Sequence, residues 1–195
     1  FRSGVRFETA HLGLEFSSVE IQSVLTDSRE IRWQSVPDIS AAVAELLFQD
    51  KVVFWFQGRM EYGPRALGGR SILARPDSAV VRDRLNRSLK RRSWFQPFCP
   101  SMLEEDARVV LEGYSGQRES FMTSAYTVAE EYREKLSGVI HTDNTCRPQV
   151  VSSPEQVPRR FFDLLREIRI RSGLGAVLNT SFNLHGEPLI CSPRE

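Results

Sequence analysis

The chain has 195 residues, of which 41% are hydrophobic and 26% are charged. This balance is typical of one globular domain and excludes an intrinsically disordered protein. The apolar run at residues 52–56 is far shorter than the roughly 18 residues needed to cross a bilayer, which excludes a membrane protein. The three cysteines, Cys99, Cys146 and Cys191, form no CxxC pair, so we expect a reducing, cytoplasmic setting without structural zinc.

The net charge of +1 conceals an uneven distribution of charge along the chain. Residues 58–92 contain ten basic and three acidic side chains, which makes this segment +7 and the remainder of the chain −6. Most of these basic residues are arginines, whose guanidinium groups bind phosphate oxygens at two points. The segment therefore predicts an anionic partner.

The first third of the chain predicts two helices, a strand and a loop. Residues 1–17 are mixed and turn-prone, as in a connector. Residues 17–20 have the spacing of a capping box, and residues 37–38 begin a clearer helix. Residues 51–57 are apolar without alternation, which predicts a central strand covered on both faces, and the glycine-rich residues 58–71 form a loop after it.

The remainder of the chain predicts a mixture of helices and strands. We expect helices at residues 77–86, 101–111 and 158–172, and strands at residues 121–128, 139–141, 149–151 and 176–178. The second of these helices rests on the capping spacing of Ser101 and Glu104, and the third ends at Gly173. Residues 192–195 repeat the capping pattern, so we expect a helix to begin there and the domain to continue beyond the chain.

Two segments combine basic residues with features of a ligand site. The loop at residues 58–71 follows a strand, where α/β proteins bind ligands, and its three arginines can neutralise phosphate. It contains no Walker A motif, and a tight loop with solvated arginines is the alternative. Residues 85–95 place a basic run beside Trp94 and Phe95, which fits either single-stranded nucleic acid or a solvated charged surface.

Two further segments carry polar side chains near predicted strand ends. His141 and Asp143 lack a third ligand or a nucleophile at a supporting spacing, so Arg147 is the better functional candidate there. Residues 179–183 can hydrogen-bond a nucleotide sugar, a phosphate or a carbonyl group, or can cap a turn.

Taken together, these segments resemble the C-terminal domain of the O-carbamoyltransferases, a family that includes nodulation, cephamycin and tobramycin carbamoyltransferases. That domain is similar to the YrdC/Sua5 threonylcarbamoyl-adenylate synthases, whose KxR and SxN signatures have counterparts at residues 90–92 and 181–183. The resemblance extends from about residue 11 to the last residue, and its motifs lie at residues 56–68, 83–86, 97–101, 179–183 and 186–188.

The resemblance implies an α+β fold, in which flanking helices cover a YrdC/Sua5-like twisted mixed sheet. It also implies that ATP, with Mg²⁺, and carbamoyl phosphate bind to the domain and give a carbamoyl-adenylate. The carbamoyl group would then pass to an acceptor hydroxyl in an upstream Kae1-like domain, which would hold Fe²⁺ or a similar metal. The implied setting is natural-product biosynthesis in the cytoplasm.

On this interpretation, residues 1–17 connect to an upstream domain, and residues 18–195 form a YrdC-like domain that is truncated at its C-terminus. The isolated unit is expected to lack full activity and to contain no metal site. Asn144 stands where the family has glycine, and asparagine tolerates the same left-handed backbone.

Adenylation passes negative charge through a pentavalent phosphorus, so catalysis is expected to rest on positive charge and positioning. The residues expected to be catalytic are Lys90, Arg147 and Ser181. The residues expected to bind nucleotide or carbamoyl phosphate are Arg59, Arg65, Arg70, Lys90, Arg92, Arg147, Asn179, Ser181 and Asn183.

Two competing interpretations remain at this point. One is a YrdC-like module that binds nucleotide or RNA without carbamoyl transfer, and the other is a structural module that only supports a neighbouring domain. Small molecules are the expected partners, and nucleic acid and membranes are not. The sequence leaves open the acceptor and the oligomeric state, a homodimer included.

Overall fold

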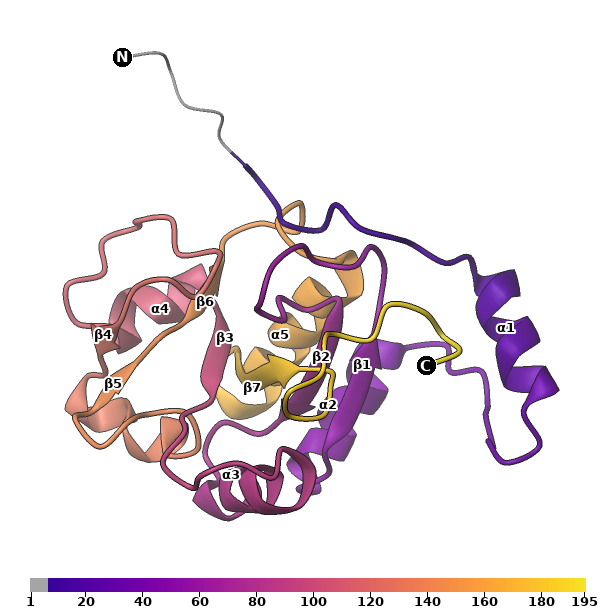
Figure 1. The fold of residues 1–195 in the computed structure, drawn as a ribbon. Helices are drawn as coiled ribbons and strands as arrows, with labels where there is room; N and C mark the ends of the chain where they lie inside the picture. The colour runs from indigo at the N-terminus through magenta and orange to yellow at the C-terminus, as the bar shows by residue number, and fades with distance from the viewer. Residues whose placement is uncertain (1–6) are drawn as a thin grey trace.

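A computed structural model describes residues 7–195 and contains a five-stranded mixed sheet in the order β1-β2-β7-β3-β6 (Figure 1). The central strand β7 is antiparallel to both of its neighbours, and β6 is parallel to β3. The strands are β1 (Val53–Phe56), β2 (Arg70–Ala74), β7 (Ala176–Ser181), β3 (Cys99–Leu103) and β6 (Gln149–Val151). With helices on both faces, this sheet confirms the expected mixed α+β fold.

Helices α2 (Ile39–Phe48) and α5 (Arg159–Ser172) cover one face of the sheet. The apolar stripe of α5 includes Phe161 and Leu165, which pack with Trp55 of β1 in one buried cluster. Gly173 ends α5 in the left-handed conformation, at a φ of 74°. The helix predicted at residues 158–172 is therefore confirmed.

Shorter elements cover the opposite face. Buried side chains of β2, β3 and β7 pack there with Val81, Leu85 and Val110. The elements on this side are α3 (Ala79–Arg84), a π-helical turn η1 (Leu85–Leu89), α4 (Glu104–Val110), the 3-10 turns η2 (Glu130–Tyr132) and η3 (Glu134–Leu136), and the antiparallel ribbon of β4 (Tyr126–Thr127) and β5 (Thr145–Cys146).

The segment before α2 contacts the sheet unit in one place and stands apart from it in another. Residues 10–14 hydrogen-bond to residues 60–62 through main-chain groups, with Gly13 N donating to Met60 O at 2.9 Å. The next element, α1 (Ser18–Asp27), has the predicted capping box between Ser17 and Glu20 but no buried residue. Figure 1 shows it beyond β1, away from the sheet.

Four sequence expectations between residues 51 and 141 are wrong. β1 is an edge strand rather than a central one, because only its Trp55 is buried and Phe54 packs outside on Phe182. No helix begins at Ser101: residues 99–103 form a fully buried strand, and α4 starts only at Glu104. The strand expected at residues 121–128 shrinks to Tyr126–Thr127, and residues 139–141 form none.

A further expectation concerns the helix predicted to begin at residues 192–195. The predicted contact of Ser192 with Glu195 forms at 3.5 Å, but no helix occurs at residues 192–195.

Among residues 7–195, no helix is long and apolar enough to span a membrane.

Candidate functional site

Lys90 meets the C-terminal end of the central strand β7. It follows the π-helical turn η1, and its side chain is buried, with 2% of the residue exposed. Its Nζ donates to Asn183 Oδ1 at 2.8 Å, to Ser181 Oγ at 3.2 Å and to the main-chain carbonyls of both residues. Ser181 Oγ donates in turn to Asn183 Oδ1 at 2.6 Å. Three of the expected site residues therefore form one hydrogen-bonded cluster.

The charge of Lys90 is unusually easy to remove. Burial and, secondarily, the neighbouring positive charge of Arg92 lower the pKa of Lys90 to about 8. An anion bound beside Nζ would oppose both effects and favour the protonated form.

Two further expected arginines lie in this region: Arg92 is a charged neighbour of Lys90, and Arg147 lies beside Cys99. Arg147 Nη2 is 3.5 Å from Cys99 Sγ, and its buried Nε has no hydrogen-bond partner. The guanidinium of Arg92 lies over the ring of Phe98, 4.4 Å from the ring centroid. Both arginines are half-buried.

No carboxylate of residues 7–195 forms an ion pair with Lys90, Arg92 or Arg147. Partly buried charges are normally paired, because desolvation of a lone charge is costly. The three cations therefore carry positive charge that no carboxylate of the described residues compensates, and such charge suits an anionic ligand.

A cavity opens beside Ser181 and Asn183. It has a volume of about 490 Å³ and lies between residues 60–64 of the β1–β2 loop and residues 181–189 after β7. The cavity is large enough for a small ligand. Glu61 lines the cavity from the loop, and Ser181 and Asn183 line it from the segment that follows β7.

Glu61 organises the β1–β2 loop, a role that the sequence analysis missed. Its carboxylate is 2% exposed and accepts main-chain N–H groups from Leu67 at 2.6 Å, Gly69 at 3.1 Å and Arg70 at 2.9 Å. The sequence feature that could have identified this role is that Glu61 is the only acidic residue in a loop rich in glycine and arginine. A carboxylate there satisfies amides that a tight loop leaves without partners.

Arg70 has a different environment from the one expected of a ligand-binding residue. It is fully buried, and Nη1 donates to the carbonyls of Gln57 at 3.3 Å, Gly58 at 3.1 Å and Gly69 at 3.2 Å. Its guanidinium also lies 3.6 Å from the centroid of the Phe56 ring. The loop that Arg70 supports encloses its side chain, so a contact between Arg70 and a ligand stays a prediction.

Asn179 also supports this loop from below. It is 2% exposed, and Nδ2 donates to Ala66 O at 3.1 Å and to Ser101 Oγ at 2.9 Å. Gln149 holds the next carbonyl of the loop, that of Leu67, at 3.0 Å. Asn179 directly precedes Thr180 and lies two residues before Ser181. Its side-chain amide, however, points toward the buried residues that support the β1–β2 loop.

The remaining expected arginines, Arg59 and Arg65, are exposed on the loop. Arg59 Nη1 donates to Gly13 O at 3.1 Å, and its Nε is 3.7 Å from Glu15. The structure therefore brings together Lys90, Ser181 and Asn183 and places Arg92 near Lys90. Arg147 lies beside Cys99, and Arg70 and Asn179 are buried supports of the loop.

The structure offers little support for metal binding at His141. His141 Nδ1 is 3.8 Å from Asp143 Oδ1, and both side chains are exposed. Residues 7–195 contain no group of three or more His, Cys, Asp or Glu side chains that could hold a metal ion. Asn144 does adopt the left-handed conformation expected at the position of the family glycine, with a φ of 63°.

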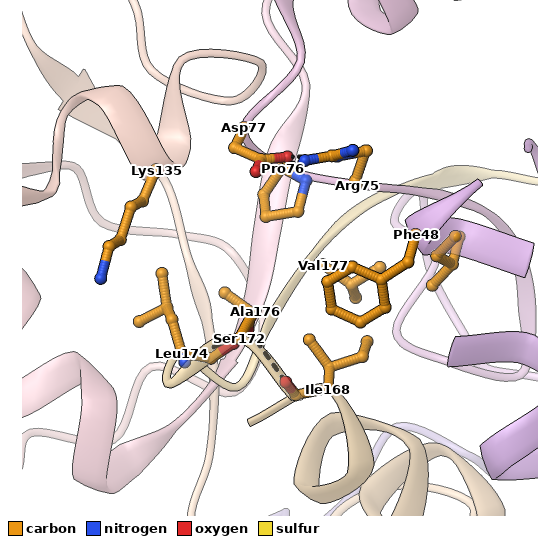
Figure 2. Close-up of a pocket in the computed structure, with 11 residues that line it drawn as sticks. Phe48, Arg75, Pro76, Asp77, Lys135, Ile168, Ser172, Leu174, Ala176 and Val177 are labelled. Atoms are coloured by element: carbon orange, nitrogen blue, oxygen red, sulfur yellow. Dashed lines mark hydrogen bonds and ion pairs between the residues drawn. The ribbon is translucent and has the colours of Figure 1, made fainter. Parts of the chain in front are cut away.

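A second cavity lies at the opposite end of β7 and contains none of the expected site residues. Figure 2 shows its mostly apolar walls, including Phe48, Ile168 and Leu174, and a volume of about 140 Å³ is available there. The charged pair at its rim is already satisfied, because Arg75 Nε lies 2.6 Å from Asp77. The candidate site is therefore the cluster at the Ser181 end of the strand.

Comparison with known proteins gives consistent matches. A family model described as the carbamoyltransferase C-terminus matches residues 44–195. An uncharacterized protein of Methanocaldococcus jannaschii, MJ1058, is 40% identical over 82% of this chain and 25% of its own length. Nodulation protein NolNO of Sinorhizobium fredii is 38% identical over 88% of this chain and 25% of its own length. Nodulation protein NolO of Bradyrhizobium diazoefficiens is 40% identical over 82% and 29%, respectively.

A solved structure shares the fold. Full-length HypF, crystallised in a phosphate- and nucleotide-bound form, superposes with a TM-score of 0.56 and 21% identity over 82% of this chain and 19% of the HypF chain. The chain spans between 25% and 37% of the length of the first curated relatives that it matches.

Proposed function

Since this chain belongs to the carbamoyltransferase C-terminal domain family, we propose that it binds ATP and carbamoyl phosphate and forms a carbamoyl-adenylate. The observation that carries the proposal is the group of three cations, Lys90, Arg92 and Arg147, which have no carboxylate partner within residues 7–195. Both substrates are phosphate compounds, and their oxygens would compensate this charge. The phosphate and nucleotide in the HypF crystal are in keeping with such ligands.

The proposed chemistry has two balanced steps. Water cleaves carbamoyl phosphate to carbamate and phosphate, and a carbamate oxygen then attacks the α-phosphorus of ATP. The bond between the α-phosphorus and the bridging oxygen breaks, and pyrophosphate leaves with the electron pair. Negative charge builds on the phosphoryl oxygens during attack, so nearby fixed cations stabilise the transition state.

Each cluster residue has a role in this proposal. Lys90 and the two arginines neutralise phosphate oxygens, while Ser181 and Asn183, which line the 490 Å³ cavity, orient the reacting group. Mg²⁺ would be held mainly by the ATP phosphates, since residues 7–195 present no cluster of carboxylates for it.

The direct test follows pyrophosphate release from ATP, Mg²⁺ and carbamoyl phosphate, with the carbamoyl-adenylate identified by mass spectrometry. We expect release that depends on carbamoyl phosphate, and a loss of about tenfold or more in Ser181→Ala. The matched control is Ser172→Ala, which removes a hydroxyl with two carbonyl partners at the far end of β7. Release that is absent from the wild-type chain, or that is equally reduced in both variants, would contradict the assignment.

A second candidate function, RNA binding, rests on the surface next to the cluster. Trp94 and Phe95 are 68% and 58% exposed, and Arg87 and Arg91 beside them are also exposed. Stacking on aromatic rings beside basic residues is how many proteins bind single-stranded nucleic acid. RNA affinity that falls steeply with salt, together with no thermal protection by ATP, would favour this function.

A further inference from the structure

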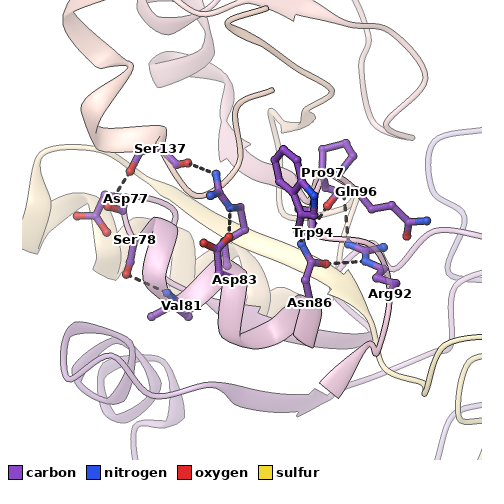
Figure 3. A network of polar contacts seen from close by, with 11 residues as sticks. Asp77, Ser78, Val81, Asp83, Asn86, Arg92, Trp94, Gln96, Pro97 and Ser137 are labelled. Carbon is purple, nitrogen blue, oxygen red and sulfur yellow. Dashed lines mark hydrogen bonds and ion pairs between the residues drawn. The ribbon is translucent and has the colours of Figure 1, made fainter. Parts of the chain in front are cut away.

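Asn86 connects the helical segment before the site to the loop that carries Arg92. It lies in the π-helical turn η1 and is fully buried, although its side chain is a polar amide. Figure 3 shows this side chain between the main chain near Trp94 and the guanidinium of Arg92. π-Helical turns of this kind are frequent at functional sites.

All three hydrogen bonds of the Asn86 side chain go to the loop at residues 92–96. Nδ2 donates to Trp94 O at 3.3 Å and to Gln96 O at 3.2 Å, while Oδ1 accepts from Arg92 Nε at 2.7 Å (Figure 3). The main chain adds one more bond, from Arg92 N to Asn86 O at 3.1 Å. Both donors and the acceptor of the amide are therefore used to fix one loop.

This loop has few other restraints. It contains no helix or strand, Arg91 has a φ of 46°, and its other main-chain bond joins Gln96 N to Ser93 O. Trp94 and Phe95 project into solvent. Residues in such a loop hold a fixed position only when neighbouring groups determine it.

The amide also has a chemical advantage over a carboxylate at this position. A neutral oxygen holds the Nε edge of Arg92 without cancelling its charge, whereas an aspartate would form an ion pair with it. The outer edge of the guanidinium, over Phe98, keeps its charge and most of its donors for a ligand.

We propose that Asn86 is a positioning residue that fixes Arg92 beside Lys90 while leaving the positive charge uncompensated. The proposal rests on the proposed function, because it assigns the anion of that site to Arg92. It adds that the geometry of the site depends on a buried residue that does not itself contact the ligand.

The first experiment measures ATP affinity by calorimetry, with Mg²⁺ present, in a double-mutant cycle. Asn86→Ala should weaken binding about tenfold, and Arg92→Ala should weaken it at least as much. The double variant should bind like Arg92→Ala alone, because Asn86 acts through Arg92. The control is Ser78→Ala, which removes the N-cap hydroxyl of α3, 3.2 Å from Val81 N, and touches neither residue.

Asn86→Asp provides a second variant that keeps an oxygen at Arg92 Nε but introduces an opposing charge. Asn86→Asp should also weaken ATP binding about tenfold or more, even if its stability equals that of Asn86→Ala. Affinity that is unchanged in either variant, losses that multiply fully in the double variant, or an equal loss in Ser78→Ala would each overturn the proposal.

Hydrogen exchange gives a readout that does not require ATP. In Asn86→Ala, amides of residues 92–97 should exchange faster, while those of β7 and α5 remain unchanged. If the wild-type chain fails to bind ATP, the proposed function falls, and exchange alone then decides whether Asn86 fixes the loop. Unchanged exchange at residues 92–97 would overturn the positioning role in either case.

Discussion

Lys90 and Arg70 are both buried cations, but their contacts give them different roles. Arg70 donates to carbonyls of its own loop and lies near the Glu61 carboxylate, so its charge is enclosed and opposed. Lys90 donates to neutral oxygens at the end of β7, with another cation rather than a carboxylate as its charged neighbour. The charged neighbour, rather than burial, distinguishes the two residues: Glu61 opposes the charge of Arg70, whereas Arg92 adds to that of Lys90.

The lowered pKa of Lys90 predicts that ATP binding depends on pH. Below about pH 8 Nζ carries its proton and attracts phosphate, and above it the free protein loses that charge, since the ordinary value is 10.5. Binding of one anion then requires uptake of one proton, so affinity should fall by up to about tenfold per pH unit above 8. Calorimetric titrations of ATP with excess Mg²⁺ between pH 7.5 and 9.5 measure this effect, because the terminal phosphate of Mg²⁺-bound ATP is ionised throughout this range.

Lys90→Arg supplies the control, because an arginine remains protonated over this range. The variant should bind ATP with little dependence on pH, whatever its absolute affinity. An equally steep profile in wild type and variant would assign the titration to another group.

At the scale of elements, side chains that accept hydrogen bonds and side chains that donate them both hold the β1–β2 loop in place. Glu61 binds its amides, while Asn179 and Gln149 bind its carbonyls from the sheet below. The close approach to α5 adds a packing constraint, because a Cβ at Gly68 would lie 2.4 Å from the Phe161 ring. The loop is therefore fixed on a rigid base beside the candidate site.

Removal of the Glu61 charge should loosen this loop. Glu61→Gln loses one acceptor oxygen and the charge that strengthens three amide contacts, so the free energy of unfolding should fall by about 1.5–3 kcal/mol. The matched control is Glu15→Gln, because Glu15 forms only an exposed pair with Arg59 at 3.7 Å and should change stability by less than about 1 kcal/mol. Urea denaturation measures the free energy of unfolding of both variants. An equal loss of stability in the two would refute the role of Glu61 in anchoring the loop.

The elements that could be predicted from the sequence are those with a strong local pattern. The apolar stripe of residues 158–172 and the glycine after it are such a pattern, and the capping box at Ser17 is another. Residues 99–103 had no such pattern, because a strand buried on both faces carries polar Ser101, whose hydroxyl bonds Gln149 at 2.6 Å across the sheet. A partner 48 residues away leaves no local signal.

In the candidate site, too, local sequence patterns could predict some features and not others. Lys90 and Ser181 are 91 residues apart, and no periodicity in the sequence brings them together. Their grouping was expected only from the family resemblance, whereas Arg70 and Asn179 were expected from the local composition of their own segments. Those two residues turn inward, and their roles depend on which loop groups lack partners after folding, a property of the assembled sheet.

At the scale of the whole molecule, one cavity lies at each end of β7, and both have mostly apolar walls. The cavity at the Ser181 end differs in that Ser181 and Asn183, two members of the Lys90 cluster, line it. The connection from β7 places residues 181–189 across from residues 60–64, so the site is assembled from segments distant in sequence.

We therefore predict that the chain of 195 residues performs adenylate formation without transfer. Its matched relatives are about three to four times longer, and we propose that acceptor binding belongs to a Kae1-like upstream domain in such proteins. Without a site that holds the hydroxyl, transfer loses the benefit of proximity, about 7–11 kcal/mol in favourable cases. Incubation with ATP, carbamoyl phosphate and sugar or aminoglycoside acceptors should yield no carbamate ester by mass spectrometry, and efficient ester formation would refute this division.

The central claim is that Lys90, Arg92 and Arg147 form an anion site for ATP, and calorimetric titration of ATP with Mg²⁺ tests it most directly. The account predicts saturable binding at one site, weakened about 10- to 150-fold by Arg147→Ala, as expected for loss of a charge-assisted hydrogen bond worth about 1.5–3 kcal/mol. Arg159→Ala, which removes a charge paired with Asp163 on exposed α5 surface, should bind like wild type. Absence of saturable binding, or equal affinity in Arg147→Ala and wild type, would contradict the account.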